Sequence, residues 1–93
     1  MSGFVQEDLP RAVEDGLRRA GVESDGELRQ GVAAARAKTA DLVSVAADAD
    51  VRDLPRIFAE RVKSALIDKF ADRVADIAVT VVVEAVKAHF RLY

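Results

Sequence analysis

The sequence predicts an all-α fold, a small helical bundle or helical hairpin that forms a single domain over residues 1–93. Three observations lead to this prediction. Apolar residues recur every three or four positions along most of the chain, which is the spacing of one helix face. Helix start and stop signals separate these stretches. All five glycines and both prolines lie before residue 56, so the C-terminal part contains no helix breaker.

The first helix is predicted over about residues 8–20. Asp8 stands just before its apolar face, where a carboxylate can accept hydrogen bonds from the first-turn amides. Pro10 suits the first turn, because no intrahelical donor is needed there. Gly21 should end the helix, since glycine adopts the left-handed conformation that often follows a helix end.

The second helix is predicted over about residues 25–48. Ser24 and Glu27 have the spacing of a capping box, which marks a helix start. The apolar stripe of this helix consists mostly of small residues, so a neighbouring helix can approach closely but buries little area per contact.

The third helix is predicted over about residues 54–92, after a second Asp-Leu-Pro-Arg start at residues 53–56. Its apolar positions step by four and three and include an eleven-residue repeat, which is close to the period of a straight helix. One long helix is favoured, and two helices joined by a kink near residue 71 are the alternative. The β-branched run at residues 77–83 would also suit a strand, but no second segment could pair with it.

The C-terminal part is apolar on two faces, which is typical of a helix that is central in its domain or shared with another chain. Two further helices, one short and one alanine-rich, offer little area to cover both faces, so we expect a homo-oligomer. The predicted core and interface residues are Phe58, Val62, Leu66, Phe70, Val74, Ile77, Val79, Val81, Val83, Val86 and Phe90.

Composition argues against an enzyme. Cysteine is absent, which excludes disulfides and thiolate chemistry. The single histidine, His89, has no serine or carboxylate at a helical spacing that would form a catalytic dyad. Phosphate-binding glycine loops and metalloprotease helices are also absent. We therefore predict no catalytic, cofactor-binding or metal-binding residues and no cofactor.

The charge pattern leaves nucleic acid as an alternative partner. Arg52, Arg56, Arg61 and Lys63 cluster at the start of the third helix and could contact DNA or an acidic protein. Acidic residues interrupt this cluster, and the formal net charge of the chain is −2. Nucleic acid is therefore not the favoured partner, and a DNA-associated regulator or antitoxin is the alternative function.

We expect a cytoplasmic protein without a membrane span. The longest strongly apolar run, at residues 77–83, is far too short to cross a bilayer. The first eight residues are mostly polar and do not resemble a signal peptide.

The favoured function is a non-enzymatic, self-associating helical protein that binds other proteins. An excess of alanine and valine, of arginine over lysine and of aspartate over glutamate is typical of a high-GC bacterium or its phages. A small phage protein, either an assembly or connector component or an inhibitor of a host protein, fits this composition and size.

Length and helical content also resemble the small secreted helical-hairpin proteins of actinobacteria, which implies a second alternative function. That family is defined by a Trp-x-Gly turn. This chain has no tryptophan, and residues 50–55, between its predicted helices, contain no glycine.

Overall fold

A computed structural model describes residues 3–92, apart from the side chain of residue 46. Its elements follow the chain in the order η1, a π-helical turn (Phe4–Asp8), α1 (Leu9–Arg19), α2 (Asp25–Thr39), α3 (Leu42–Asp48), η2, a 3-10 turn (Val51–Asp53), α4 (Leu54–Leu66) and α5 (Asp72–Phe90). No described residue lies in a strand, so the all-α prediction is confirmed. Residues 77–83 are helical, and the strand interpretation is wrong.

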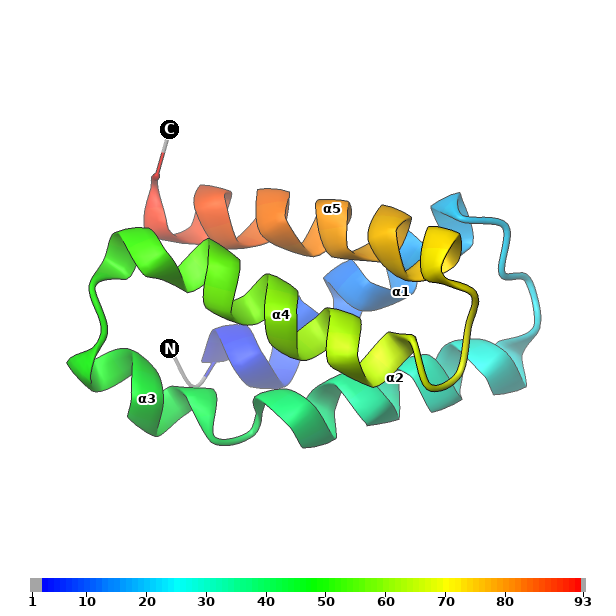
Figure 1. The fold of residues 1–93 in the computed structure, drawn as a ribbon, viewed down its shortest axis with the longest axis horizontal. Coiled ribbons are helices and arrows are strands. Elements are labelled where there is room, and N and C mark those ends of the chain that lie inside the picture. Colours follow the sequence, from blue (N-terminus) through cyan, green and yellow to red (C-terminus); the bar gives the residue numbers. More distant parts are fainter. Residues whose placement is uncertain (1–2, 93) are drawn as a thin grey trace.

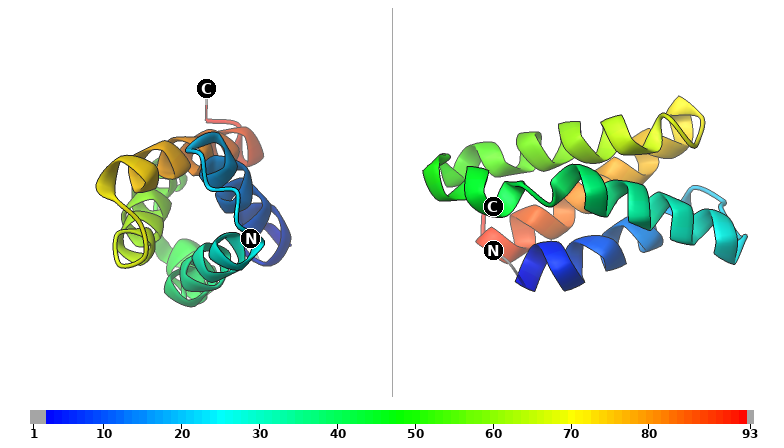
Figure 2. Two further views of the ribbon diagram at one scale, coloured as in Figure 1. Left: turned by 90° about the vertical axis from the view of Figure 1, so that its right-hand side faces the viewer. Right: turned by 90° about the horizontal axis from the view of Figure 1, so that it is seen from below.

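Four helices form the walls of a bundle (Figure 1). α1 packs against α2 and α5, and α4 packs against the same two helices. Seen along its length, the bundle is a square of four helices around a common core (Figure 2). Successive long helices run in opposite directions, so each is antiparallel to both of its neighbours. The bundle measures 36 × 24 × 20 Å.

Aromatic side chains meet at the end of the bundle where η1 and the last turn of α5 lie (Figure 1). The fully buried Phe58 meets Phe4 edge to face, with ring centroids 5.4 Å apart. The Phe4 ring also lies 4.8 Å from His89 and 5.9 Å from Phe90. His89 Nδ1 is 3.9 Å from a carboxylate oxygen of Asp8. The only histidine therefore belongs to an aromatic contact between the first and last helical segments.

The turn between α1 and α2 follows the sequence signals, whereas two predicted aspartate caps do not. Gly21 has a φ of 99°, and Ser24 Oγ accepts a hydrogen bond from the amide of Glu27 at 3.4 Å. Asp8 makes no side-chain cap, because the chain is already helical from Phe4 onward. Asp53 makes none either, because the 3-10 turn η2 runs directly into α4.

The predicted helix over residues 25–48 is two helices, because the chain breaks between Thr39 and Leu42. A helix end leaves carbonyl oxygens without intrahelical donors. Here the backbone oxygen of Lys38 accepts a hydrogen bond from Arg61 Nη1 at 3.0 Å. The same nitrogen donates to Asp41 Oδ1 at 2.6 Å. A side chain from α4 thus stabilises the break between α2 and α3.

The single helix predicted over residues 54–92 is wrong. The alternative of two helices is correct, but a reversing turn over residues 67–71 joins them in place of the predicted kink near residue 71. α4 ends at Leu66, whose carbonyl accepts the amides of Lys69 and Phe70, and Ala71 is extended with ψ of 153°. A continuous helix of this length would measure about 58 Å, far longer than the bundle. The break instead lets α5 fold back along α4 and bury its apolar face.

The buried seam of α5 lies between the two faces that the sequence analysis singled out. Four residues spaced by three and four positions are fully buried on it, namely Ala75, Ala78, Val82 and Val86. The predicted stripe through Val74, Ile77 and Val81 lies along one flank of this seam and is half-buried. Periodicity located an apolar helix correctly but did not identify which side of it faces the core.

Candidate interaction surface

The predicted core and interface residues fall into two groups. Phe58, Val62, Leu66 and Val86 are fully buried inside the bundle. The other seven are half-buried, namely Phe70, Val74, Ile77, Val79, Val81, Val83 and Phe90. Five of these half-buried side chains pack against the core, namely Phe70, Val74, Val79, Val81 and Phe90. None of the seven is among the exposed large hydrophobic residues of the described chain.

This arrangement removes the reason for which oligomerisation was predicted from the C-terminal helix. That prediction assumed two other helices and an uncovered second face. The bundle has α1 and α4 on either side of α5, and together they bury its central seam. Homo-oligomer formation stays a prediction, and a surface that supports it has to be found elsewhere on the molecule.

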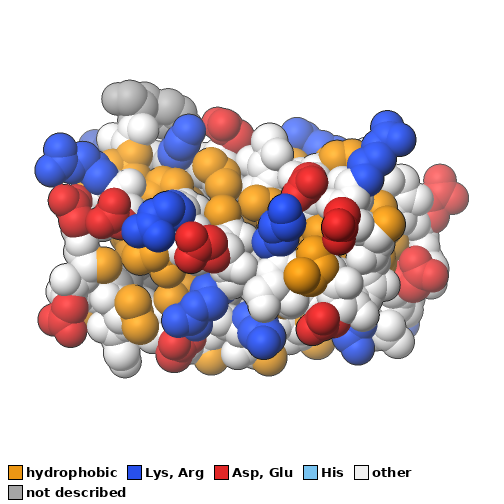
Figure 3. Space-filling model, in the orientation of Figure 1, with side chains coloured by type: hydrophobic (Ala, Val, Ile, Leu, Met, Phe, Trp, Pro, Cys, Tyr) orange, Lys and Arg blue, Asp and Glu red, His pale blue; other side chains and the backbone are white. Residues whose placement is uncertain are grey.

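The four basic residues proposed for nucleic acid or an acidic partner each contact a carboxylate of the same chain. Arg52 pairs with Asp50 at 3.3 Å and Arg56 with Glu60 at 3.4 Å. Arg61 meets Asp41, and Lys63 Nζ lies 3.0 Å from Asp76 Oδ1. Acidic and basic side chains alternate over the face that α4 occupies in Figure 1 (Figure 3). These four residues therefore do not form an uninterrupted basic surface. The alternative function, a DNA-associated regulator or antitoxin, stays a prediction.

The ion pairs that join different helical segments shift the pKa values of the side chains that form them. The hydrogen bond from Arg61 holds the pKa of Asp41 below its ordinary value, and Asp41 in turn raises the pKa of Arg61. Asp76 raises the pKa of Lys63, chiefly through a side-chain hydrogen bond. All of these groups are solvent-exposed, so they tie helices together without forming a buried charged site.

Replacing Arg61 with glutamine should raise the pKa of Asp41 toward its ordinary value, because the main cause of its depression is removed. Since the pKa of Asp41 is lowered by folding, its favourable contribution is present above the unfolded pKa and is lost as pH falls through the folded pKa. A carbon-detected NMR titration of the carboxyl group measures this shift. Arg56→Gln is the matched control and should leave Asp41 unchanged; equal titration curves for Asp41 in wild type and Arg61→Gln would contradict the assignment.

Neither a metal centre nor a membrane span is evident in the part of the chain that the structure describes. No group of three histidine, cysteine, aspartate or glutamate side chains there could hold a metal ion. None of the described helices has both the length and the apolar character needed to cross a bilayer. The absence of catalytic activity and of cofactors, and the cytoplasmic location, stay predictions.

The most exposed apolar region surrounds α3, which the sequence analysis did not single out. Val43, Val45 and Val51 are 39%, 37% and 42% exposed, and we call them the α3 surface. Hydrophobic side chains are visible over α3 at the lower left of Figure 3. Leu42 anchors this short helix in the core. Helical periodicity gave no signal for this surface, because Val43 and Val45 lie off the apolar stripe that was predicted for residues 25–48.

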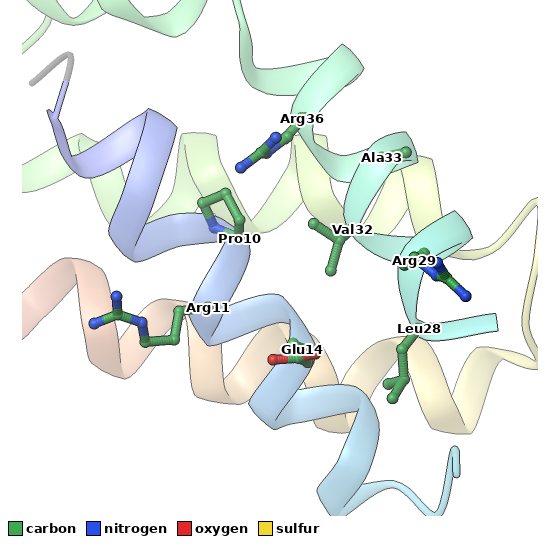
Figure 4. A pocket seen from close by; sticks show the side chains of 8 residues that line it. All are labelled: Pro10, Arg11, Glu14, Leu28, Arg29, Val32, Ala33 and Arg36. Carbon is green, nitrogen blue, oxygen red and sulfur yellow. The ribbon is translucent and has the colours of Figure 1, made fainter. Parts of the chain in front are cut away.

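A second feature is an open groove between α1 and α2, with a volume of about 380 Å³. Apolar side chains lie between the two helices and charged side chains flank them, with Arg11 extending from α1 away from α2 (Figure 4). The floor contains Pro10, Leu28 and Val32, and the rim carries Arg11, Glu14, Arg29 and Arg36. These arginines were not predicted as a site from the sequence, although Arg29 and Arg36 are seven residues apart and therefore lie on one helix face.

Comparison with protein-family models, with curated proteins and with solved structures finds no match for this chain.

Proposed function

We propose that this chain is a non-enzymatic helical interaction protein that self-associates through the α3 surface. The observation that carries the proposal is the concentration of exposed valines on and beside one short helix. Three of the four large hydrophobic residues that are exposed in the described chain, Val43, Val45 and Val51, lie there. Bringing them together in a dimer removes apolar area from water, which favours association.

Charges on either side of α3 favour a second copy of the same chain as the occupant. Lys38 lies in the last turn of α2, just before the break that precedes α3, and Asp48 is the last residue of α3; both are exposed. Neither side chain forms an ion pair with another described residue. If two copies of α3 pack antiparallel about a two-fold axis, Lys38 of each copy faces Asp48 of the other. The same patch on both chains is then self-complementary.

The α3 surface is small compared with the roughly 800 Å² per partner of a standard stable interface. We therefore expect a dimer that dissociates on dilution. Light scattering on a sizing column, over a hundredfold range of concentration, should show the molar mass rising from one chain to two. A mass of one chain at every concentration would contradict self-association.

The double variant Val43→Glu/Val45→Glu should remain a monomer. The two positions point to different sides of α3, so the double substitution puts a buried charge in the contact whichever side meets the partner. Ile67→Glu is the matched control. Ile67 is 45% exposed, and it lies in the turn between α4 and α5, at the opposite end of the bundle from α3 (Figure 1). The Ile67→Glu variant should dimerise as the wild-type protein does. Dimerisation of the double variant at wild-type strength would place the interface elsewhere.

Exchanging the two charges tests the antiparallel arrangement. Lys38→Asp alone should weaken the dimer, and Lys38→Asp/Asp48→Lys should restore it. Within this class of function, the phage component, the host-protein inhibitor and the secreted helical-hairpin protein stay predictions from the sequence.

A further inference from the structure

We infer that the groove between α1 and α2 docks an acidic amphipathic helix of a partner protein. We call it the arginine groove, defined by the floor residues Pro10, Leu28 and Val32 and the rim residues Arg11, Arg29 and Arg36. The lining of the arginine groove contains none of the valines of the α3 surface, although its rim residue Arg36 also lines a neighbouring hollow with Val43.

The floor of the arginine groove can accept apolar side chains. Leu28 is only 2% exposed and Pro10 is buried, whereas Val32 is half-buried and stands between the two helices (Figure 4). The groove is open along its length, so a small molecule would remain largely in solvent, in contrast to most small-molecule sites. An elongated ligand that lies along the helices covers more of this floor.

The rim has an excess of positive charge although the whole chain is net negative. Glu14 is the only acidic residue in the lining, and Arg18 Nη2 lies 3.5 Å from its carboxylate, so its charge is already met within α1. None of the three rim arginines forms an ion pair with a described carboxylate. The complementary ligand is therefore acidic.

Two of the rim arginines are held by backbone oxygens, which sets their position. Arg36 Nη2 donates to the carbonyl of Gln6 at 3.2 Å, and Arg29 Nε donates to the carbonyl of Asp25 at 3.4 Å. A guanidinium group has five N–H donors, so each arginine keeps donors for a carboxylate. Bidentate pairing with carboxylates is the geometry that arginine favours.

The spacing of Arg29 and Arg36 indicates the pattern of carboxylates that the ligand should carry. These two arginines are seven positions apart on α2, which is about 10.5 Å along the helix axis. A helical ligand lying parallel to α2 matches this spacing with carboxylates at positions i and i+7. Apolar side chains at i+3 and i+4 then lie over Val32 and the floor, which is the helix-in-groove mode of recognition.

Fluorescence anisotropy with a labelled helical peptide of about 15 residues tests this inference. The probe carries glutamates at i and i+7 and leucines at i+3 and i+4. It should bind the wild-type protein, and binding should weaken as salt is raised. A second peptide, with lysines in place of the two glutamates, should bind at least about tenfold more weakly. No binding of the first peptide would overturn the inference.

Charge reversal on the protein side provides the decisive comparison. Arg29→Glu/Arg36→Glu should lose binding to the glutamate peptide by about tenfold or more and gain binding to the lysine peptide. Arg73→Glu, an exposed substitution on α5, is the matched control and should bind as wild type does. The gain toward the lysine peptide is a result that a merely unfolded variant cannot produce. Equal binding of the glutamate peptide by wild type and the double variant would overturn the inference.

Two further measurements separate this inference from its alternatives. Vesicles of phosphatidylserine and phosphatidylcholine should not compete with the glutamate peptide, and competition would overturn the inference in favour of an anionic lipid surface. Val45→Glu, at a position that lines neither the arginine groove nor the neighbouring hollow that Arg36 shares with Val43, should bind the peptide at wild-type strength, so a failure of self-association and a failure of peptide docking are distinguishable. Loss of peptide binding in that variant would place the docking site at α3.

Discussion

Truncating Phe58 to alanine should lower the free energy of unfolding by about 3–5 kcal/mol. The Phe58 side chain is fully buried, and its ring contacts Phe4 edge to face at a centroid distance of 5.4 Å. Removing it therefore loses apolar burial and leaves a cavity at the end of the bundle where the first helical turn closes the core. Chemical denaturation followed by circular dichroism measures the change.

The size of this effect matters because a small domain has a total stability of only about 5–15 kcal/mol. Ile67→Ala is the matched control, since Ile67 is 45% exposed and its truncation should change stability by no more than about 0.5 kcal/mol. A Phe58→Ala variant as stable as Ile67→Ala would show that the aromatic end of the bundle is not packed as described. Loss of the Phe4 contact should also loosen the N-terminal turn, which proteolysis would detect.

Replacing Gly16 with alanine should lower the free energy of unfolding by about 1–3 kcal/mol, the usual effect of overpacking. A Cβ atom at Gly16 would lie 2.6 Å from the Cα of Ala78 and 2.9 Å from its carbonyl oxygen. Both contacts are with the backbone of α5, so no side-chain rotation relieves them. The helices α1 and α5 would have to separate at the point where they approach each other closely. Thermal or chemical unfolding measures the loss.

The same substitution at Gly26 should have the opposite sign. The nearest heavy atom to a Cβ atom at Gly26 is Ser24 Oγ at 3.8 Å, an ordinary contact. Because alanine has less conformational freedom in the unfolded chain, Gly26→Ala should raise the free energy of unfolding by about 0.4–1 kcal/mol. If Gly16→Ala were as stable as the wild type or more stable, the close approach of α1 to Ala78 would be wrong.

Local signals predicted the helical class and one turn well. The left-handed Gly21 and the capping hydrogen bond of Ser24 depend on residues within a few positions of each other, so they can be recognised without knowledge of the fold. The Asp8 and Asp53 caps failed for the opposite reason. Helical turns precede both residues, and the packing of Phe4 in the core accompanies the earlier start of the first helix.

The two candidate surfaces were harder to predict than the fold. Exposure of a valine on α3 depends on where α2 ends, and that break involves Arg61 on a distant helix. The arginine groove exists because α1 and α2 lie side by side, which no spacing within either helix reveals. The predicted basic cluster, by contrast, was visible in the sequence but is partly neutralised in the structure. Its ion pairs with Asp41 and Asp76 form only after the helices assemble.

By itself, the sequence determined that the chain forms helices and where its apolar stretches lie, because helical periodicity is a local property. Only the tertiary structure decided that residues 54–92 break into two helices and that Ala78 and Val82 face the core. A helix that is apolar on more than one side has no preferred inward face of its own. Its orientation depends on which neighbour can approach closely, and here α1 offers Gly16 opposite Ala78. The compact bundle therefore favours a break between α4 and α5, although no glycine or proline lies there to mark it.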